Sequence, residues 1–247
     1  FAGGRNARPR RVVSLMRLRP WLPACLVLAA AGAAAQPGVP PAGEALSYEV
    51  NWPSGLSLGE AHFKAAPAEG ASGGWDFSIS IDAAIPGFSV SDRFRSRTTE
   101  AFCSLEFEKN TSHGKRLTHE RVTFEPAAGT ARRETIKGGS SELALAPCAK
   151  DALAFLYYLR RELAQGRLPA AQTVVFGGEY RLRLEHAGRQ TIRVGGREFA
   201  ADRLLVAASG KASETSIEIF LAQDAARRPL LVRVPLALGT FSLELVP

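Results

Sequence analysis

The sequence has few of the residue types that build metal sites. It contains four histidines and three cysteines among 247 residues. His113 and His119 are six residues apart, and in an extended chain this spacing separates them by about 20 Å, too far for shared metal ligation. A hairpin between them would bring them closer, but the sequence offers no third ligand beside them. The sequence therefore predicts neither a metal nor another cofactor.

Two motifs of enzyme active sites are also missing. No glycine-rich phosphate loop leads from a strand into a helix, and no Gly-x-Ser-x-Gly elbow occurs. Residues 112–115 match Ser-x-x-Lys, but they fall in an expected hairpin turn rather than at the start of a helix. The polar strands do carry carboxylates that leave an enzymatic alternative open, namely Glu106, Glu108, Glu120 and Glu125. Carboxylates on strand faces are usually only solvated, so we lean towards a protein that is not an enzyme.

Long apolar runs are absent except near the beginning, where Trp21–Ala31 follows Arg17 and Arg19. Small residues at positions 33–35 then fit a signal-peptidase site. The run is too short to span a membrane comfortably. We therefore expect residues 1–35 to be an upstream segment plus a signal peptide that starts at Met16. Residues 36–43 would form a flexible lead-in and residues 44–247 a single β-rich domain, exported to a bacterial periplasm.

The basic character of the chain belongs mostly to that first segment. The whole sequence has a net charge of +7, yet residues 1–35 hold six of its 31 basic residues and no acidic one. The remainder carries 25 basic and 24 acidic residues. Overall basicity therefore gives no support to a nucleic-acid partner.

Two cysteines remain after the expected leader, Cys103 and Cys148. An even pair of cysteines in an exported protein is more often a disulfide than a metal site. We predict that the two are bonded, which would tie the middle strands to the segment before the predicted helix. The alternative is two buried free thiols.

The mature chain reads mainly as short strands. Leu46, Tyr48, Val50 and Trp52 alternate with polar residues, and residues 75–81 repeat this period-two pattern. Ten or more such segments follow at spacings of roughly 8 to 12 residues, with glycine pairs where hairpins would turn. They predict a curved antiparallel sheet, either an open barrel or a sandwich. A bulge is expected near Gly59.

One segment, Asp151–Gln165, has helical periodicity instead. Asp151 is the expected N-cap and Gly166 the expected stop. Ala154, Arg161 and Gln165 fall on the face opposite the apolar stripe. The stripe consists of Ala152, Phe155, Leu156, Leu159 and Leu163. We expect this amphipathic helix to pack against the sheet or to close one open side of it.

Three aromatic residues of the helix are the candidate ligand-facing residues. Tyr157 and Tyr158 flank the stripe, and Phe155 belongs to it. Either tyrosine would present its hydroxyl at the rim of a cavity whose walls are side chains of the sheet. In the simpler interpretation, these rings fill the interface between helix and sheet.

Arg93, Arg95 and Arg97 alternate along another segment and form a stripe on one strand face. We interpret the stripe as a solvated outer face that discourages edge pairing. Contact with an anionic ligand or headgroup is the alternative.

Several segments together resemble the exported bacterial family called domain of unknown function 3108. They are LSYEVNW, DRFRSRT, VTFEP with ARRE, DALAFLYYLR, and DAARRPLLVRV with LGTFSLEL. The resemblance covers residues 46–246 and implies an envelope location and a β-rich fold with a helix, but no catalytic residues. By architecture alone, the chain also resembles the half-barrel carriers of periplasmic lipoproteins.

Composition and resemblance lead to one principal hypothesis and two alternatives. The principal one is a non-enzymatic protein that binds an apolar ligand, a lipid or an envelope protein. The alternatives are an envelope enzyme that acts on glycan or lipid, and a structural or assembly factor recognised through a sheet edge.

Overall fold

The computed structural model describes residues 43–69, 73–85, 87–211, 213–236 and 239–247. The predicted signal peptide and nearly all of the predicted lead-in lie outside these residues. The segment from residue 35 onwards forms one compact unit, and only this unit is described below.

The described residues contain fifteen strands and one helix. In chain order, they are β1 (Glu44–Asn51), β2 (Ser57–Pro67), β3 (Trp75–Ile85), β4 (Phe88–Thr98), β5 (Ser104–His113), β6 (Arg116–Glu125), β7 (Thr130–Thr135), β8 (Ser140–Ala144), β9 (Lys150–Asp151), α1 (Ala152–Ala164), β10 (Gln172–Val175), β11 (Glu179–Val194), β12 (Arg197–Gly210), β13 (Glu214–Ala222), β14 (Pro229–Leu236) and β15 (Gly239–Val246).

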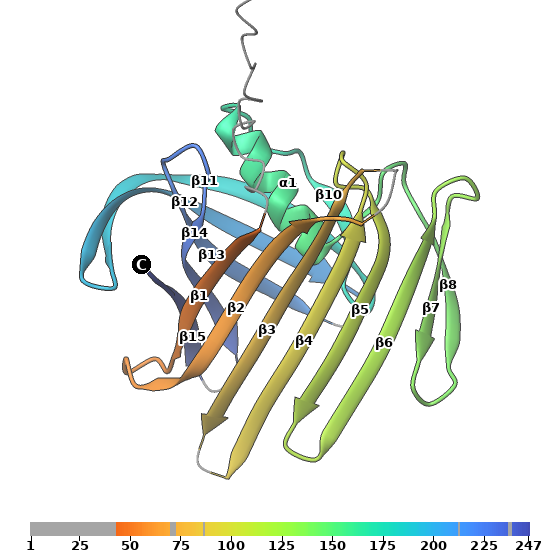
Figure 1. The fold of residues 1–247 in the computed structure, drawn as a ribbon, viewed down its shortest axis with the longest axis horizontal. Coiled ribbons are helices and arrows are strands. Elements are labelled where there is room, and N and C mark those ends of the chain that lie inside the picture. Colours follow the sequence, from red (N-terminus) through yellow and green to blue (C-terminus); the bar gives the residue numbers. More distant parts are fainter. Residues whose placement is uncertain (1–42, 70–72, 86, 212, 237–238) are drawn as a thin grey trace, which may run out of the picture. The chain divides into compact units, whose positions relative to one another are not determined.

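All fifteen of these strands form one sheet in the order β8-β7-β6-β5-β4-β3-β2-β1-β15-β14-β13-β12-β11-β10-β9. Neighbouring strands are antiparallel except β9 and β10, which run parallel. The sheet curls around α1 without closing, because β8 and β9 remain its two edges (Figure 1). The predicted class, a curved antiparallel sheet with one packed helix, is confirmed in its open form.

Alternation in the sequence becomes alternation in burial along β1. Every second residue from Glu44 to Val50 is buried. Tyr48 lies opposite Leu245 of β15, so both side chains face the concave side. The expected bulge occurs where the register of β1 and β2 shifts beside Gly59. A Cβ atom at Gly59 would lie 2.0 Å from the carbonyl oxygen of Asp82, so only glycine fits there.

The predicted helix is confirmed at both ends. Asp151 is its N-cap, Gln165 its C-cap, and Gly166 follows with a φ of +72°. Ala154, which lies on the face opposite the stripe, is fully buried. Leu153 and Tyr157 are also buried and join the core cluster formed with β2 to β7. The curled sheet surrounds more of the helix than a flat sheet would, which is why burial extends beyond the stripe.

Three apolar clusters make up the core. One joins β1 and β2 to β15 and to residues of β11 to β14. The second lies between β2 to β7 and one side of α1, and the third lies between β10 to β13 and the other side of α1. The helix therefore separates the two halves of the concave face.

A buried ion pair holds α1 to the first strand. Nη1 and Nη2 of Arg160 donate to the two carboxylate oxygens of Glu44 at 2.8 and 2.7 Å. Nε of Arg160 also donates to the carbonyl oxygen of Ala226 at 3.1 Å. Removing one partner of such a buried pair costs about 3 to 5 kcal/mol, because a buried charge is left alone. This contact fixes the position of the helix across the sheet.

Candidate functional site

An apolar cavity of about 410 Å³ lies between α1 and the concave face of the sheet. This volume falls in the range typical of small-molecule sites. The helix contributes Ala152, Phe155, Leu156 and Leu159. The remaining lining residues come from the sheet and its turns and are Phe63, Ile79, Val174, Phe176, Tyr180, Leu182, Val206, Ala208, Ser213, Thr215, Ile217, Ile219, Val232 and Val234. Apart from the hydroxyl groups of Tyr180, Ser213 and Thr215, these side chains are apolar.

The cavity exists because only part of the apolar stripe of α1 packs against the sheet. Four of the five stripe residues line the cavity, while Phe155, Leu159 and Leu163 are buried in the third cluster. Leu156 and Ala152 are only half-buried. A stripe of this kind normally packs into a core. Here it leaves apolar surface facing a space between helix and sheet.

Asp151 fixes where α1 begins. Its Oδ1 accepts hydrogen bonds from the backbone N–H groups of Leu153 and Ala154 at 2.8 and 3.0 Å. Its Oδ2 accepts from the hydroxyl groups of Ser96 and Ser104, both at 2.6 Å. Asp151 is completely buried, and this burial raises the pKa of its carboxyl group although the four hydrogen bonds favour the charged form. The first turn of the helix is therefore tied to β4 and β5.

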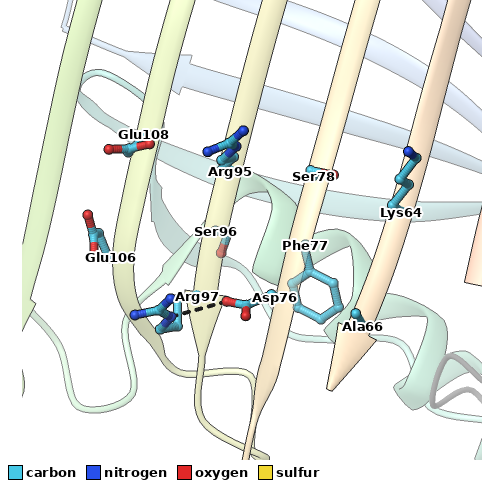
Figure 2. A pocket seen from close by; sticks show the side chains of 10 residues that line it. All are labelled: Lys64, Ala66, Asp76, Phe77, Ser78, Arg95, Ser96, Arg97, Glu106 and Glu108. Atoms are coloured by element: carbon cyan, nitrogen blue, oxygen red, sulfur yellow. Dashed lines mark hydrogen bonds and ion pairs between the residues drawn. The ribbon is translucent and has the colours of Figure 1, made fainter. Parts of the chain in front are cut away.

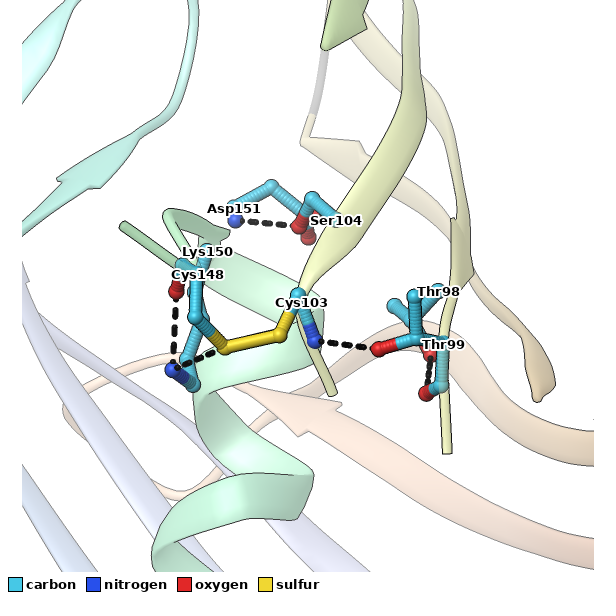
Figure 3. Close-up of a disulfide and its surroundings, with 7 residues drawn as sticks. All are labelled: Thr98, Thr99, Cys103, Ser104, Cys148, Lys150 and Asp151. Carbon is cyan, nitrogen blue, oxygen red and sulfur yellow. Dashed lines mark hydrogen bonds between the residues drawn. A yellow bond between two sulfur atoms is a disulfide. The ribbon is translucent and has the colours of Figure 1, made fainter. Parts of the chain in front are cut away.

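A disulfide joins Cys103 and Cys148 in the same region (Figure 3). The two Cα atoms are 4.6 Å apart and the residues are separated by 45 positions. Nζ of Lys150 donates to the carbonyl oxygen of Cys148 at 3.0 Å. The predicted disulfide is thus present, and it links the β4–β5 turn to the segment that enters α1.

The three predicted ligand-facing residues do not lie together. Phe155 lines the cavity. Tyr157 stacks on Phe77 with ring centroids 4.0 Å apart and is fully buried in the second cluster. Tyr158 is half-buried, and Nζ of Lys150 lies 4.4 Å above its ring. Burial raises the pKa of both tyrosines. Contact between any of them and a ligand stays a prediction.

Tyr157 also contains an unusual buried polar group. Its hydroxyl has no hydrogen-bond partner among the described residues. The guanidinium of Arg160 lies 4.8 Å from the centre of its ring. Stacking of the Tyr157 ring on the Phe77 ring contributes about 0.5 to 1.5 kcal/mol beyond the buried area. The Tyr157 ring therefore has a structural role in holding α1 against β3.

A second hollow, of about 430 Å³, lies across β2 to β5 on the opposite face of the sheet (Figure 2). Charged side chains of both signs line it. Arg97 Nε is 3.1 Å from Asp76 Oδ1, and Arg93 Nη2 is 2.7 Å from Asp82 Oδ2. Arg95 alone of the stripe has no ion pair among the described residues. The arginine stripe therefore fits a solvated outer face better than a ligand site.

The four candidate carboxylates of the enzymatic alternative lie away from the cavity. Glu106 and Glu108 both pair with Arg121. Glu120 pairs with Arg133 at 2.8 Å, and the remaining one, Glu125, is exposed. Ion pairing on strand faces accounts for three of these four side chains.

The histidines form separate polar contacts rather than one cluster. His113 Nε2 is 2.8 Å from Asp92 Oδ1, and burial raises the pKa of Asp92. His186 Nε2 is 2.9 Å from Asp202 Oδ1. Burial opposes ionisation of Asp202, but the hydrogen bond from His186 and the charge of Arg227 lower its pKa overall. Within the described ranges, no three His, Cys, Asp or Glu side chains gather as a metal site would require.

Sequence reasoning did not identify the strand side of the cavity. Ile217, Ile219 and Val232 belong to alternating segments, and that alternation marks them as facing inward. It does not show whether an inward face meets a packed core or a void. That distinction depends on how the curled sheet places β13 and β14 relative to α1.

Comparisons with known proteins agree with the architecture. A family model described as "Protein of unknown function (DUF3108)" matches residues 47–246. A crystal structure of a beta-barrel-like protein of domain of unknown function DUF1849 from Brucella abortus is similar, with a TM-score of 0.59 and 10% identity over 84% of this chain and 97% of that chain. At this identity the likeness concerns the fold alone. A search of curated proteins found no match.

Among the described residues, no helix has both the length and the apolar character needed to cross a bilayer.

Proposed function

The chain belongs to the family described as protein of unknown function DUF3108, and we propose that it is a non-enzymatic binding protein whose cavity holds an apolar ligand. The ligand class we propose is a lipid or another molecule with an acyl chain. The family description assigns no activity, so the proposal rests on the cavity itself.

One observation carries this proposal: four residues of the apolar stripe of α1 line an apolar cavity of about 410 Å³, and two of them, Ala152 and Leu156, are only half-buried. Burying one methylene group is worth about 0.8 kcal/mol. Ten buried methylenes would give on the order of 8 kcal/mol before the cost of immobilising the ligand. A dissociation constant on the order of micromolar or weaker follows.

The three hydroxyl groups in the lining suit this ligand class. They belong to Tyr180, Ser213 and Thr215, which lie near the ends of β11, β12 and β13 that adjoin one another. They would hydrogen-bond an ester or carboxyl group while the chain lies against Leu156 and Ile219. A cavity lined in this way binds and orients a ligand but supplies no general acid or base.

We further propose that the protein works after export, in the periplasm or an equivalent compartment. The sequence pattern of residues 17–36 supports export. A disulfide between Cys103 and Cys148 suits an oxidising compartment. Free lipid or a lipid-modified partner is available as a ligand at the cell envelope.

Titration of the full chain with N-phenyl-1-naphthylamine, an uncharged dye that fluoresces in apolar sites, tests the proposal. We expect saturable binding near one dye per chain and displacement by a saturated fatty acid. Leu156→Trp would fill the cavity, because Leu156 is half-buried in its wall. This variant should weaken dye binding at least tenfold while the melting temperature stays within a few degrees.

Leu168→Trp is the matched control, because Leu168 is exposed and lies outside the cavity. It adds the same ring to the same chain and should leave dye binding unchanged. Equal binding by both variants, or binding without saturation, would contradict the proposed site.

A further inference from the structure

One end of the sheet collects hairpin turns. Neighbouring strands are antiparallel, so every second turn falls at the same end. The turns β1–β2, β3–β4, β5–β6 and β7–β8 therefore lie together, along the lower edge in Figure 1, whereas α1 lies in the upper part. The pairing of Asn51 with Ser242 places the end of β14 and the start of β15 at this end too. We call this end the turn rim.

Exposed apolar side chains concentrate on the turn rim. Seven large apolar residues are exposed in the described part of the chain. The five on the rim, whose exposure ranges from 45% for Phe88 to 66% for Leu117, are Leu56, Phe88, Leu117, Ile136 and Leu236. The other two, Leu168 and Val246, belong to the opposite end. Single exposed apolar residues are ordinary, but five of seven on successive turns of one end form a pattern.

Positive charge accompanies these apolar tips. The exposed cations beside them are Lys115, Arg116 and Lys137. The connecting sequences at residues 52–56, 86–87, 114–115, 136–139 and 237–238 contain no aspartate or glutamate. The nearest acid along the chain is Glu134 of β7, which pairs with Arg132 at 2.9 Å.

The opposite end has a different charge pattern. Glu69, Glu100 and Asp224 lie in its turns and are exposed. The contrast arises within a unit whose basic and acidic residues are nearly balanced overall. Local placement, rather than net charge, thus makes one end both basic and apolar.

We propose that the turn rim docks on the surface of an anionic lipid bilayer. Apolar side chains at turn tips reach the boundary between headgroups and acyl chains, and each nearby cation adds attraction to anionic lipid. A protein groove would need a continuous apolar face, whereas these tips are separated by polar strand ends. The proposal concerns the outer rim and does not depend on the cavity holding a ligand.

Vesicle sedimentation of the full chain provides the first test. Phosphatidylcholine vesicles with about 30% phosphatidylglycerol should bind the protein more tightly than vesicles of phosphatidylcholine alone. The double variant Lys115→Glu with Lys137→Glu should weaken binding at least tenfold, since each cation contributes about fivefold near an anionic surface. The double variant Lys64→Glu with Arg197→Glu makes the same charge change away from the rim and should stay within twofold of wild type. Equal losses in the two variants would overturn the proposal.

Residues 1–42 are common to all variants and contribute equally, so a local probe completes the design. Leu117→Trp places an indole on the rim and Leu168→Trp places one at the opposite end. Anionic vesicles should shift the emission of Leu117→Trp to shorter wavelength, and brominated lipid should quench it. Leu168→Trp should show neither effect beyond that of wild type. A shift of the same size in both variants, or in neither, would contradict docking through the rim.

Discussion

Asp151 combines the capping of a helix with a fully buried carboxyl group. The cap requires only acceptor oxygens for the N–H groups of Leu153 and Ala154. Burial opposes the negative charge and raises the pKa of Asp151 above its ordinary value of 3.8. Ionisation of the buried carboxyl group therefore destabilises the folded state, whereas its hydrogen bonds stabilise that state.

Asp151→Asn separates these two effects. Between pH 3.8 and the raised pKa, the unfolded chain loses the proton of Asp151 while the folded chain keeps it. The free energy of unfolding of the wild type therefore falls as pH rises through this window. Asparagine does not ionise, and its amide can donate to Ser96 and Ser104. We expect urea denaturation to show that the free energy of unfolding of Asp151→Asn, measured relative to that of wild type, is higher at pH 7 than at pH 3.5.

Asp151→Ala is the control for the cap itself. It removes every acceptor and should lower the free energy of unfolding by about 2 kcal/mol or more at both pH values. If Asp151→Asn instead lost stability relative to wild type as pH rose, the carboxylate would be stabilised by its hydrogen bonds more than it is destabilised by burial.

At the scale of elements, α1 depends on what is attached to its two ends. Asp151 and the disulfide between Cys103 and Cys148 hold its N-terminal end. Arg160 and Glu44 hold it nearer the C-terminal end. Between these anchors, Ala152 and Leu156 line the cavity while Phe155 and Leu159 also pack against the sheet.

The double variant Cys103→Ser with Cys148→Ser should lower the free energy of unfolding by about 4 kcal/mol, because the unfolded chain gains the freedom of a loop closed across 45 positions. Chemical denaturation measures this loss. Hydrogen exchange should also quicken in the first turn of α1 more than in β13. Treating the wild type with a reductant should reproduce both changes, and unchanged exchange in α1 would show that the disulfide does not anchor the helix.

The sequence predicted the helix well because its cap, stop and stripe are local signals. Asp151 and Gly166 mark its ends in both the prediction and the structure. The buried pair of Arg160 and Glu44 was not predictable, because the two residues are 116 positions apart and a charged side chain on a helix is usually solvated. Tyr157 was placed near a ligand from its flanking position, but the curl of the sheet brings Phe77 against it.

At the scale of the whole molecule, alternation predicted the strands but not the curvature of the sheet. A sandwich and an open barrel have the same period-two pattern. The curvature follows from twist and from register shifts, such as those between Val50 and Asn51 and between His186 and Arg189. Only the curled sheet places β10 to β14 across from α1 and leaves a cavity between them.

The central claim is that the apolar stripe of α1 and the facing strands form a site for an acyl chain. Photo-cross-linking with a fatty acid that carries a diazirine on its alkyl chain tests this claim most directly. After irradiation of the full chain, mass spectrometry should find the adduct on residues 152–159 of α1 and on β12 to β14, and excess unlabelled fatty acid should suppress it. Adducts spread over the turn rim or the outer face, without suppression by the competitor, would contradict the account.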